Sequence, residues 1–97
     1  MTILGVNLLV AFEAKYPPAR KAFGNWRRVV EQAKWANLIE LQGAFSSADY
    51  VAPHIVFNID GSKYRIIALV KFPLQLLQIE VALTHKQYND WKPKKKS

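Results

Sequence analysis

Four side chains in the second half of the chain are of the types that phosphodiester chemistry needs. Lys63 and Arg65 lie two residues apart in a strand-like segment, while His85 and Tyr88 are spaced to share one side of a helical turn. An arginine stays charged and its planar fork binds two phosphate oxygens, and a lysine adds electrostatic stabilisation. A histidine can take or give a proton near neutral pH. This set suits metal-independent RNA cleavage, in which a base activates the 2′-hydroxyl, a cation stabilises the transition state and an acid protonates the leaving 5′-oxygen.

Each of these residues also has a purely structural interpretation, which the sequence leaves open. A cation on a strand is most often solvated surface, and a histidine after a strand can simply cap the next helix. Asn58, which lies shortly before Asp60-Gly61, is better explained by turn chemistry when the residue is considered alone. The two histidines are far apart in a chain without cysteine, so we expect no metal site and no cofactor.

The charge of the chain indicates a polyanionic partner. Lys and Arg total 14 against seven Asp and Glu, a formal net charge of +7, and residues 54–97 carry eight basic and three acidic side chains. This excess favours nucleic acid, an acidic protein or an anionic membrane. Because there is no cysteine, disulfides, thiolate metal sites and a cysteine nucleophile are excluded.

The length of 97 residues suits one compact domain, residues 1–97, with a basic tail at 92–97. The apolar start, residues 1–10, is too short to span a bilayer and lacks the basic segment of a signal peptide, so we expect a soluble, cytoplasmic protein.

The elements that must position these residues begin with a short strand at residues 1–4 and a helix that ends at Pro17-Pro18. A second helix begins near Pro18, and Asn37 with Glu40 predicts a capped third helix. Residues 46–53 are predicted to be a loop. The second helix has a strong amphipathic stripe formed by Ala19, Ala22, Phe23, Trp26, Val29, Val30 and Ala33.

After residue 53 the hydrophobic period changes from helical to two, which predicts strands. Residues 54–59 and 62–72 read as a hairpin with Asp60-Gly61 as a two-residue turn, so that Asn58 faces Lys63. A further strand is predicted at 75–83, with Leu69 opposite Gln78 and Ile67 opposite Glu80, followed by a short helix that Thr84 caps.

This pairing divides the strands into two faces, because side chains alternate across a sheet. The open face mixes polar and apolar groups and carries Lys63, Arg65 and Lys71, which we expect to form a wettable, cationic surface. The other face should pack beneath the helices, and its members are Ile55, Phe57, Ile59, Tyr64, Ile66, Ala68, Val70, Leu77, Ile79, Val81 and Leu83.

Three motifs in this order resemble one family. VFNIDGSKYRIIA at residues 56–68 resembles the hairpin of HigB-type toxins, and THKQYN at 84–89 resembles their closing THxEYD signature. Trp26, Lys34-Trp35 and FSSAD at 45–49 are similar to the central segment of the family, so that the resemblance extends over residues 16–90. Gln87 and Asn89 stand where the family has acidic residues.

The resemblance implies a RelE-like α+β fold, in which an N-terminal strand and two to three helices pack on one face of a small antiparallel sheet. It implies the toxin of a type II toxin–antitoxin system, an mRNA interferase that cuts mRNA, in most members at the ribosome. A HigA-like antitoxin with a helix-turn-helix would neutralise it. Carried over by position, the catalytic candidates are Arg65, His85, Lys63 and Tyr88, and Asn58 is a further motif residue.

Three lysines complete the candidates for RNA binding. Lys71 follows from the strand pattern, Lys34 from the helical segment, and Lys86 is the neighbour of His85. The alternative to a nuclease is a non-catalytic module whose basic surface binds RNA or the ribosome, or docks an antitoxin. Cleaved message, as opposed to bound but intact message, distinguishes the two.

Overall fold

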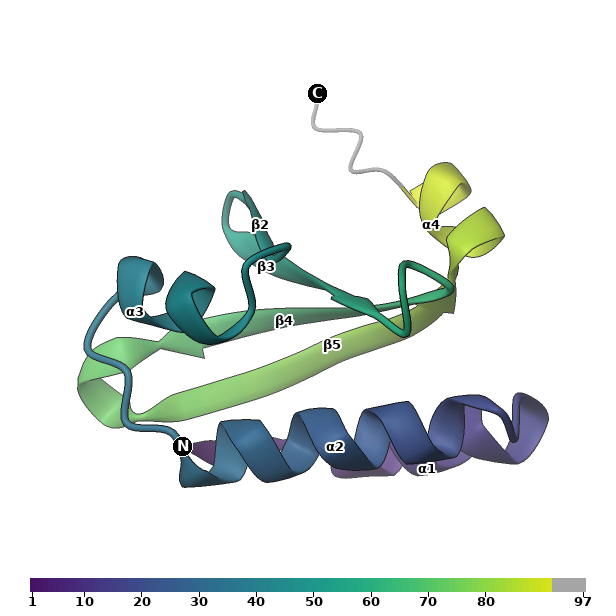
Figure 1. Ribbon diagram of the computed structural model, residues 1–97, viewed down its shortest axis with the longest axis horizontal. Helices are drawn as coiled ribbons and strands as arrows, with labels where there is room; N and C mark the ends of the chain where they lie inside the picture. Colours follow the sequence, from purple (N-terminus) through teal and green to yellow (C-terminus); the bar gives the residue numbers. More distant parts are fainter. Residues whose placement is uncertain (92–97) are drawn as a thin grey trace.

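A mixed sheet forms the centre of the molecule in the computed structural model, which describes residues 1–91 (Figure 1). Within those residues five strands lie in the order β1-β5-β4-β3-β2. The pairs are antiparallel except that β1 runs parallel to β5 at one edge. The strands are β1 (Thr2–Leu4), β2 (Asp49–Val51), β3 (His54–Ile59), β4 (Tyr64–Lys71) and β5 (Leu76–Thr84). The expected α+β class and helix-on-sheet arrangement are confirmed.

The predicted helices are confirmed, and they begin and end where the sequence signals them. Helix α1 ends just before Pro17-Pro18, and Asn37 caps α3 by accepting a 3.0 Å hydrogen bond from the amide of Glu40. Among residues 1–91, no helix combines the length and apolar character needed to cross a bilayer. The helices are α1 (Val6–Lys15), α2 (Ala19–Gln32), α3 (Leu38–Ala44) and α4 (His85–Trp91), and the short 3₁₀ helix η1 spans Phe72–Leu74.

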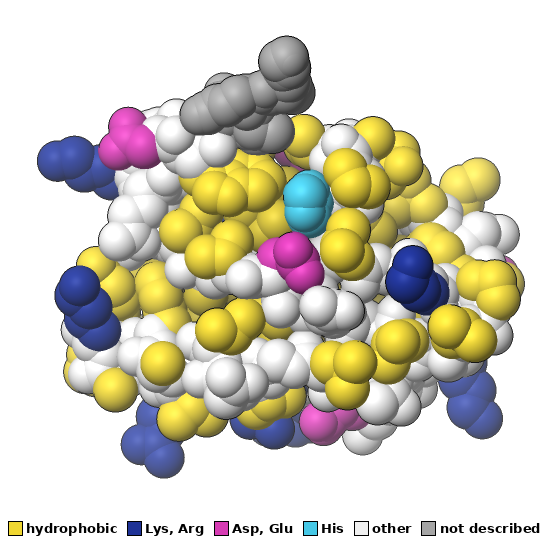
Figure 2. All heavy atoms as spheres, turned by 180° about the vertical axis from the view of Figure 1, so that it is seen from behind, with side chains coloured by type: hydrophobic (Ala, Val, Ile, Leu, Met, Phe, Trp, Pro, Cys, Tyr) yellow, Lys and Arg dark blue, Asp and Glu magenta, His cyan; other side chains and the backbone are white. Residues whose placement is uncertain are grey.

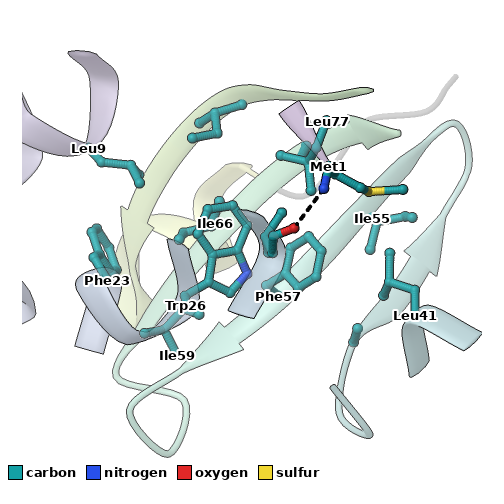
Figure 3. Close-up of a cluster of buried hydrophobic side chains, with 14 of the residues drawn as sticks. Met1, Leu9, Phe23, Trp26, Leu41, Ile55, Phe57, Ile59, Ile66 and Leu77 are labelled. Atoms are coloured by element: carbon teal, nitrogen blue, oxygen red, sulfur yellow. Dashed lines mark hydrogen bonds between the residues drawn. The ribbon is translucent and has the colours of Figure 1, made fainter. Parts of the chain in front are cut away.

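The hydrophobic core lies between the sheet and the first three helices, and we call this side of the sheet the inner face. Trp26 of α2 packs edge-on against Phe57 of β3, with ring centroids 5.2 Å apart (Figure 3). Leu9 of α1 and Leu41 of α3 are fully buried in the same cluster. The amino group of Met1 donates a 3.0 Å hydrogen bond to the carbonyl of Val30 near the end of α2 (Figure 3). The core therefore fixes the sheet on which the candidate site is built.

The hairpin β3–β4 differs from the predicted register by two residues. Ile59 pairs with Tyr64, and Asn58 pairs with Arg65 instead of Lys63. The connection is a four-residue loop in which Asp60, Gly61 and Ser62 have positive φ angles of 55°, 62° and 84°. A slip of two residues leaves every side chain on its predicted face, so the alternation pattern could not detect it.

The pairing of β4 with β5 also departs from the prediction. Leu69 pairs with Gln78 as expected, but a bulge between Ile67 and Ala68 places Ile67 opposite Val81, and Glu80 has no partner. Beyond the bulge the faces of β5 exchange. Val81 and Leu83, predicted for the inner face, therefore lie on the outer face, whereas Ala82 packs against the core.

The outer face is less open than predicted. Val56 and Ile67 lie on it and are 1% and 0% exposed. Helix α4 lies on this side of the sheet, because His85 and Tyr88 contact Arg65 and Trp91, at the end of the helix, contacts His54. The prediction of a wettable surface is therefore wrong for this part of the outer face, where Val56, Ile67 and Arg65 are buried.

Two further expectations concern segments outside the main elements. The predicted loop at 46–53 contains β2, which pairs with β3 at the free edge of the sheet. The basic tail at 92–97 lies outside the described residues.

Candidate active site

Arg65 is the centre of the candidate site and is far more buried than the sequence suggested, with 8% of its surface exposed. It is the second residue of β4, on the outer face, opposite Leu83 of β5. Its Nη1 donates to the carbonyl of Ser62 at 2.6 Å and lies 3.4 Å from the carbonyl of Tyr64. One edge of the guanidinium is therefore fixed by the hairpin loop, and Nη2 is directed elsewhere.

Helix α4 brings His85 and Tyr88 to the free edge of that guanidinium. Nη2 of Arg65 lies 3.2 Å from Nδ1 of His85, and the centre of the guanidinium lies 5.0 Å from the centroid of the Tyr88 ring. Stacking on an aromatic ring holds a guanidinium by cation–π attraction. The structure thus brings together Arg65, His85 and Tyr88, three of the catalytic candidates, whose contact the sequence left open.

The start of α4 explains why His85 is in this place. Thr84 and Gln87 form a reciprocal capping box, in which the amide of Gln87 donates to Thr84 Oγ1 at 3.1 Å and the amide of Thr84 donates to Gln87 Oε1 at 2.9 Å. The amide of His85 donates to the carbonyl of Lys63 at 2.9 Å. Gln87, which replaces the acidic residue of the family motif, therefore serves to start the helix.

The contact between Arg65 and His85 engages one of the two ring nitrogens of the imidazole. A guanidinium has donors and no acceptor, so Nδ1 of His85 must accept in this hydrogen bond. His85 itself is exposed, so Nε2 can reach a bound substrate.

Arg65 carries a positive charge that no carboxylate neutralises within residues 1–91. The ion pairs in this part of the chain join Arg27 to Glu31 and Lys63 to Asp60. The partners of Arg65 are two carbonyls, an imidazole and an aromatic ring, none of which is an anion. Buried charges in proteins are normally paired, so an unpaired one indicates a site prepared for an anion. A phosphate group meets that need.

Lys63 and Lys86 lie close to this cluster along the chain. Lys63 stands in the hairpin loop and not on the strand as predicted, and its Nζ lies 3.8 Å from Asp60 with 71% of the side chain exposed. Lys86 is exposed on α4 next to His85. Both cations lie beside the loop and helix that hold Arg65 and His85.

The other predicted RNA-binding residues are not part of the cluster. Asn58 lies across from Arg65, but its amide donates to the carbonyl of Ser47 at 2.7 Å, as a structural role would require. Lys71 ends β4, six residues from Arg65, which is about 20 Å of strand. Lys34 is exposed near Met1 and Gln75, at the opposite end of the sheet from Arg65.

Two residues that support α4 were not among the predicted site residues. Trp91 stacks with Tyr88 at 6.0 Å between ring centroids and meets the ring of His54 edge-on at 5.7 Å. These contacts hold α4 against β3, and they keep the ring of Tyr88 next to the guanidinium of Arg65. The only sequence signal was the aromatic spacing of Tyr88 and Trp91. No group of three or more potential metal ligands exists among the described residues.

The family of the chain follows from its similarity to known proteins. Residues 19–91 match the model of a family described as "HigB_toxin, RelE-like toxic component of a toxin-antitoxin system". The chain belongs to this family. As a member of the HigB family it is the toxic component of a toxin–antitoxin system and has an antitoxin as its partner. The matched segment contains every predicted site residue.

Curated relatives agree with this assignment. The chain is 30% identical to the mRNA interferase toxin HigB of Escherichia coli K12 over 78 residues, which cover 77% of this chain and 75% of the relative. The mRNA interferases HigB of Escherichia coli O157:H7 and of Shigella flexneri match with the same identity and coverage.

Proposed function

We propose that this HigB-family chain is an mRNA interferase, an endoribonuclease that cleaves mRNA on the ribosome without a metal ion and so inhibits translation. Its relatives bear that name. We further propose that it acts in the cytoplasm as a single domain and that a HigA-like helix-turn-helix protein is its antitoxin.

The observation that carries the proposal is the buried, unneutralised guanidinium of Arg65 in contact with His85. The edge of Arg65 that bears Nη2 binds the scissile phosphate and stabilises the charge of the transition state. Tyr88 keeps the guanidinium plane in place, and the carbonyl of Ser62 keeps its other edge fixed.

The remaining roles follow from position. His85 transfers a proton through its imidazole, as base toward the 2′-hydroxyl or as acid toward the 5′-oxygen. Lys63 and Lys86 hold the RNA backbone beside the scissile group. Lys71 and Lys34 attract RNA further away, where their distance from Arg65 leaves them no part in the chemistry. Asn58, on the strand beside Arg65, is a further RNA contact.

The test is cleavage of a defined message on purified translating ribosomes. The wild-type protein should cut the message and leave a 2′,3′-cyclic or 3′-phosphate end, and a single 2′-deoxy nucleotide at the cut position should block cleavage. Arg65→Ala should remain folded and leave the message intact. A message that is bound but never cut by the wild-type protein would establish the binding module instead.

A further inference from the structure

Helix α1 is apolar on nearly every side, although it lies at the surface of the molecule. Seven of its ten residues are Ala, Val, Leu or Phe, yet only Leu9 is fully buried. Leu8 and Val10 are 37% and 56% exposed, and Leu4, just before the helix, is 44% exposed. A helix that is hydrophobic all round is ordinarily buried. Figure 2 shows the molecule from behind the view of Figure 1. Hydrophobic side chains lie on the lower part of that face, and Lys and Arg side chains lie around its edge.

A groove runs between α1 and α2 beside this apolar surface. It has a volume of about 670 Å³, and Val10, Ala14 and Pro17 form its apolar wall. Gly24 of α2 also lines the groove, and a Cβ added there would meet no atom within 4 Å. The missing side chain therefore leaves a notch in the middle of α2 that can receive a side chain from another molecule.

Arginines line the other side of the groove. Arg20 is exposed, and Nε of Arg27 is buried without a hydrogen-bond partner among the described residues. The 3.9 Å contact of Arg27 with Glu31 uses Nη2 only. With 36% of its side chain exposed, the guanidinium of Arg27 can still pair with a carboxylate placed in the groove. Glu13 is the one acidic residue that lines the groove.

The apolar wall and the arginines together indicate which kind of molecule binds in the groove. Nucleic acid would use the cations but leave the apolar wall exposed, so a protein fits better. A second copy would bring another chain of net charge +7 against the arginines, so it is disfavoured. A helix with one apolar stripe bordered by Asp and Glu satisfies both the wall and the arginines.

We propose that the groove between α1 and α2 binds an acidic amphipathic helix of the antitoxin, with an apolar side chain seated over Gly24 and carboxylates on Arg20 and Arg27. The inference rests on the proposed function for the identity of its partner. Helix α1 spans about 15 Å, which matches two to three turns of the bound helix. Because α1 and α2 cover the inner face and Arg65 lies on the outer face, the bound helix would leave Arg65 and His85 uncovered.

The test measures binding of the cognate antitoxin to the toxin by isothermal titration calorimetry. The antitoxin is taken as the protein encoded in the adjoining reading frame whose co-expression restores growth. All toxin variants carry Arg65→Ala as well, so that they can be produced alone and binding is measured without catalysis. Gly24→Trp fills the notch and should weaken binding at least a hundredfold.

The matched control is Gly43→Trp, because Gly43 is also a helical glycine whose added Cβ would meet nothing within 4 Å. It should change the dissociation constant less than twofold. Arg20→Glu should weaken binding at least tenfold at low salt and less at high salt, since screening reduces the charge effect. This surface substitution keeps the test decisive if Gly24→Trp proves unstable in a thermal melt.

Three outcomes would overturn the proposal. Gly24→Trp and Arg20→Glu could bind the antitoxin as tightly as the parent, Gly43→Trp could weaken binding equally, or the two groove variants could lose ribosome binding while keeping the antitoxin. Failure of the proposed nuclease is read separately, from message cleavage by the wild-type protein, and does not alter the calorimetric result.

Discussion

Replacing Arg65 by lysine tests whether the site needs both edges of the guanidinium or only its positive charge. In the wild-type protein Nη1 holds the carbonyl of Ser62 at 2.6 Å while Nη2 faces His85 at 3.2 Å. A lysine ammonium keeps the charge, but its single nitrogen cannot occupy both places. If it bonds to the loop carbonyl, the donor directed at the phosphate is lost.

The expected loss of cleavage rate is much larger than the expected loss of stability. Removal of one donor directed at the transition state lowers a rate by about 10²–10³-fold, roughly 3–4 kcal/mol. The stability loss comprises one hydrogen bond, about 1 kcal/mol, and weaker stacking on Tyr88, about 1 kcal/mol. A total of about 2 kcal/mol is small against the 5–15 kcal/mol that is usual for a domain. Arg65→Lys should therefore be folded and nearly inactive.

Single-turnover cleavage on ribosomes measures the rate, and urea denaturation measures the free energy of unfolding. Arg65→Ala serves as the comparison and should be no more than about tenfold slower than Arg65→Lys, because both lack the same donor. Retention of more than a tenth of the wild-type rate by Arg65→Lys would refute the argument, since charge alone would then suffice. So would a loss of activity that follows the unfolded fraction.

Four further substitutions test the candidate site and the fold that supports it. If His85 is the acid, His85→Ala should be restored toward the wild-type rate on a message with a 5′-bridging sulfur at the cut position, because a thiolate leaves without protonation; no restoration assigns it as the base. Thr84→Val removes the cap of α4 and should cost about 1 kcal/mol in urea denaturation and lower the cleavage rate, since His85 begins that helix. Gly5→Ala should cost about 2–4 kcal/mol, because the φ angle of Gly5 is +90° and a Cβ would lie 2.9 Å from the carbonyl of Ile79, whereas Gly24→Ala should stabilise by about 1 kcal/mol.

The helices and their ends could be read from the sequence because their signals are local. The spacing of apolar residues, Pro17-Pro18, the cap at Asn37 and the cap at Thr84 each act within a few residues. The approach of Arg65 to His85 was expected only as a possibility of the predicted strand order, and the structure places them 3.2 Å apart.

The errors arose where the decisive interaction is not local. A hairpin slip of two residues conserves both faces, so the pattern around Asn58 could not reveal the four-residue loop. The bulge that leaves Glu80 unpaired has no sequence signal of its own, and it moves Val81 and Leu83 to the other face. The burial of Arg65 depends on α4 lying across the outer face, which only the tertiary structure determines.

The corrected loop explains why the candidate residues meet at all. Two consecutive carbonyls of this loop hold the two halves of the site: Ser62 accepts from Arg65, and Lys63 accepts from the amide of His85. A two-residue turn would have placed Ser62 and Lys63 in the strand, where successive carbonyls point to opposite edges and bond to neighbouring strands. Ser62 instead has a φ angle of 84°, which is costly for a residue other than glycine. The strain in this loop is therefore coupled to the site, because it frees both carbonyls to join the end of the hairpin to the start of α4.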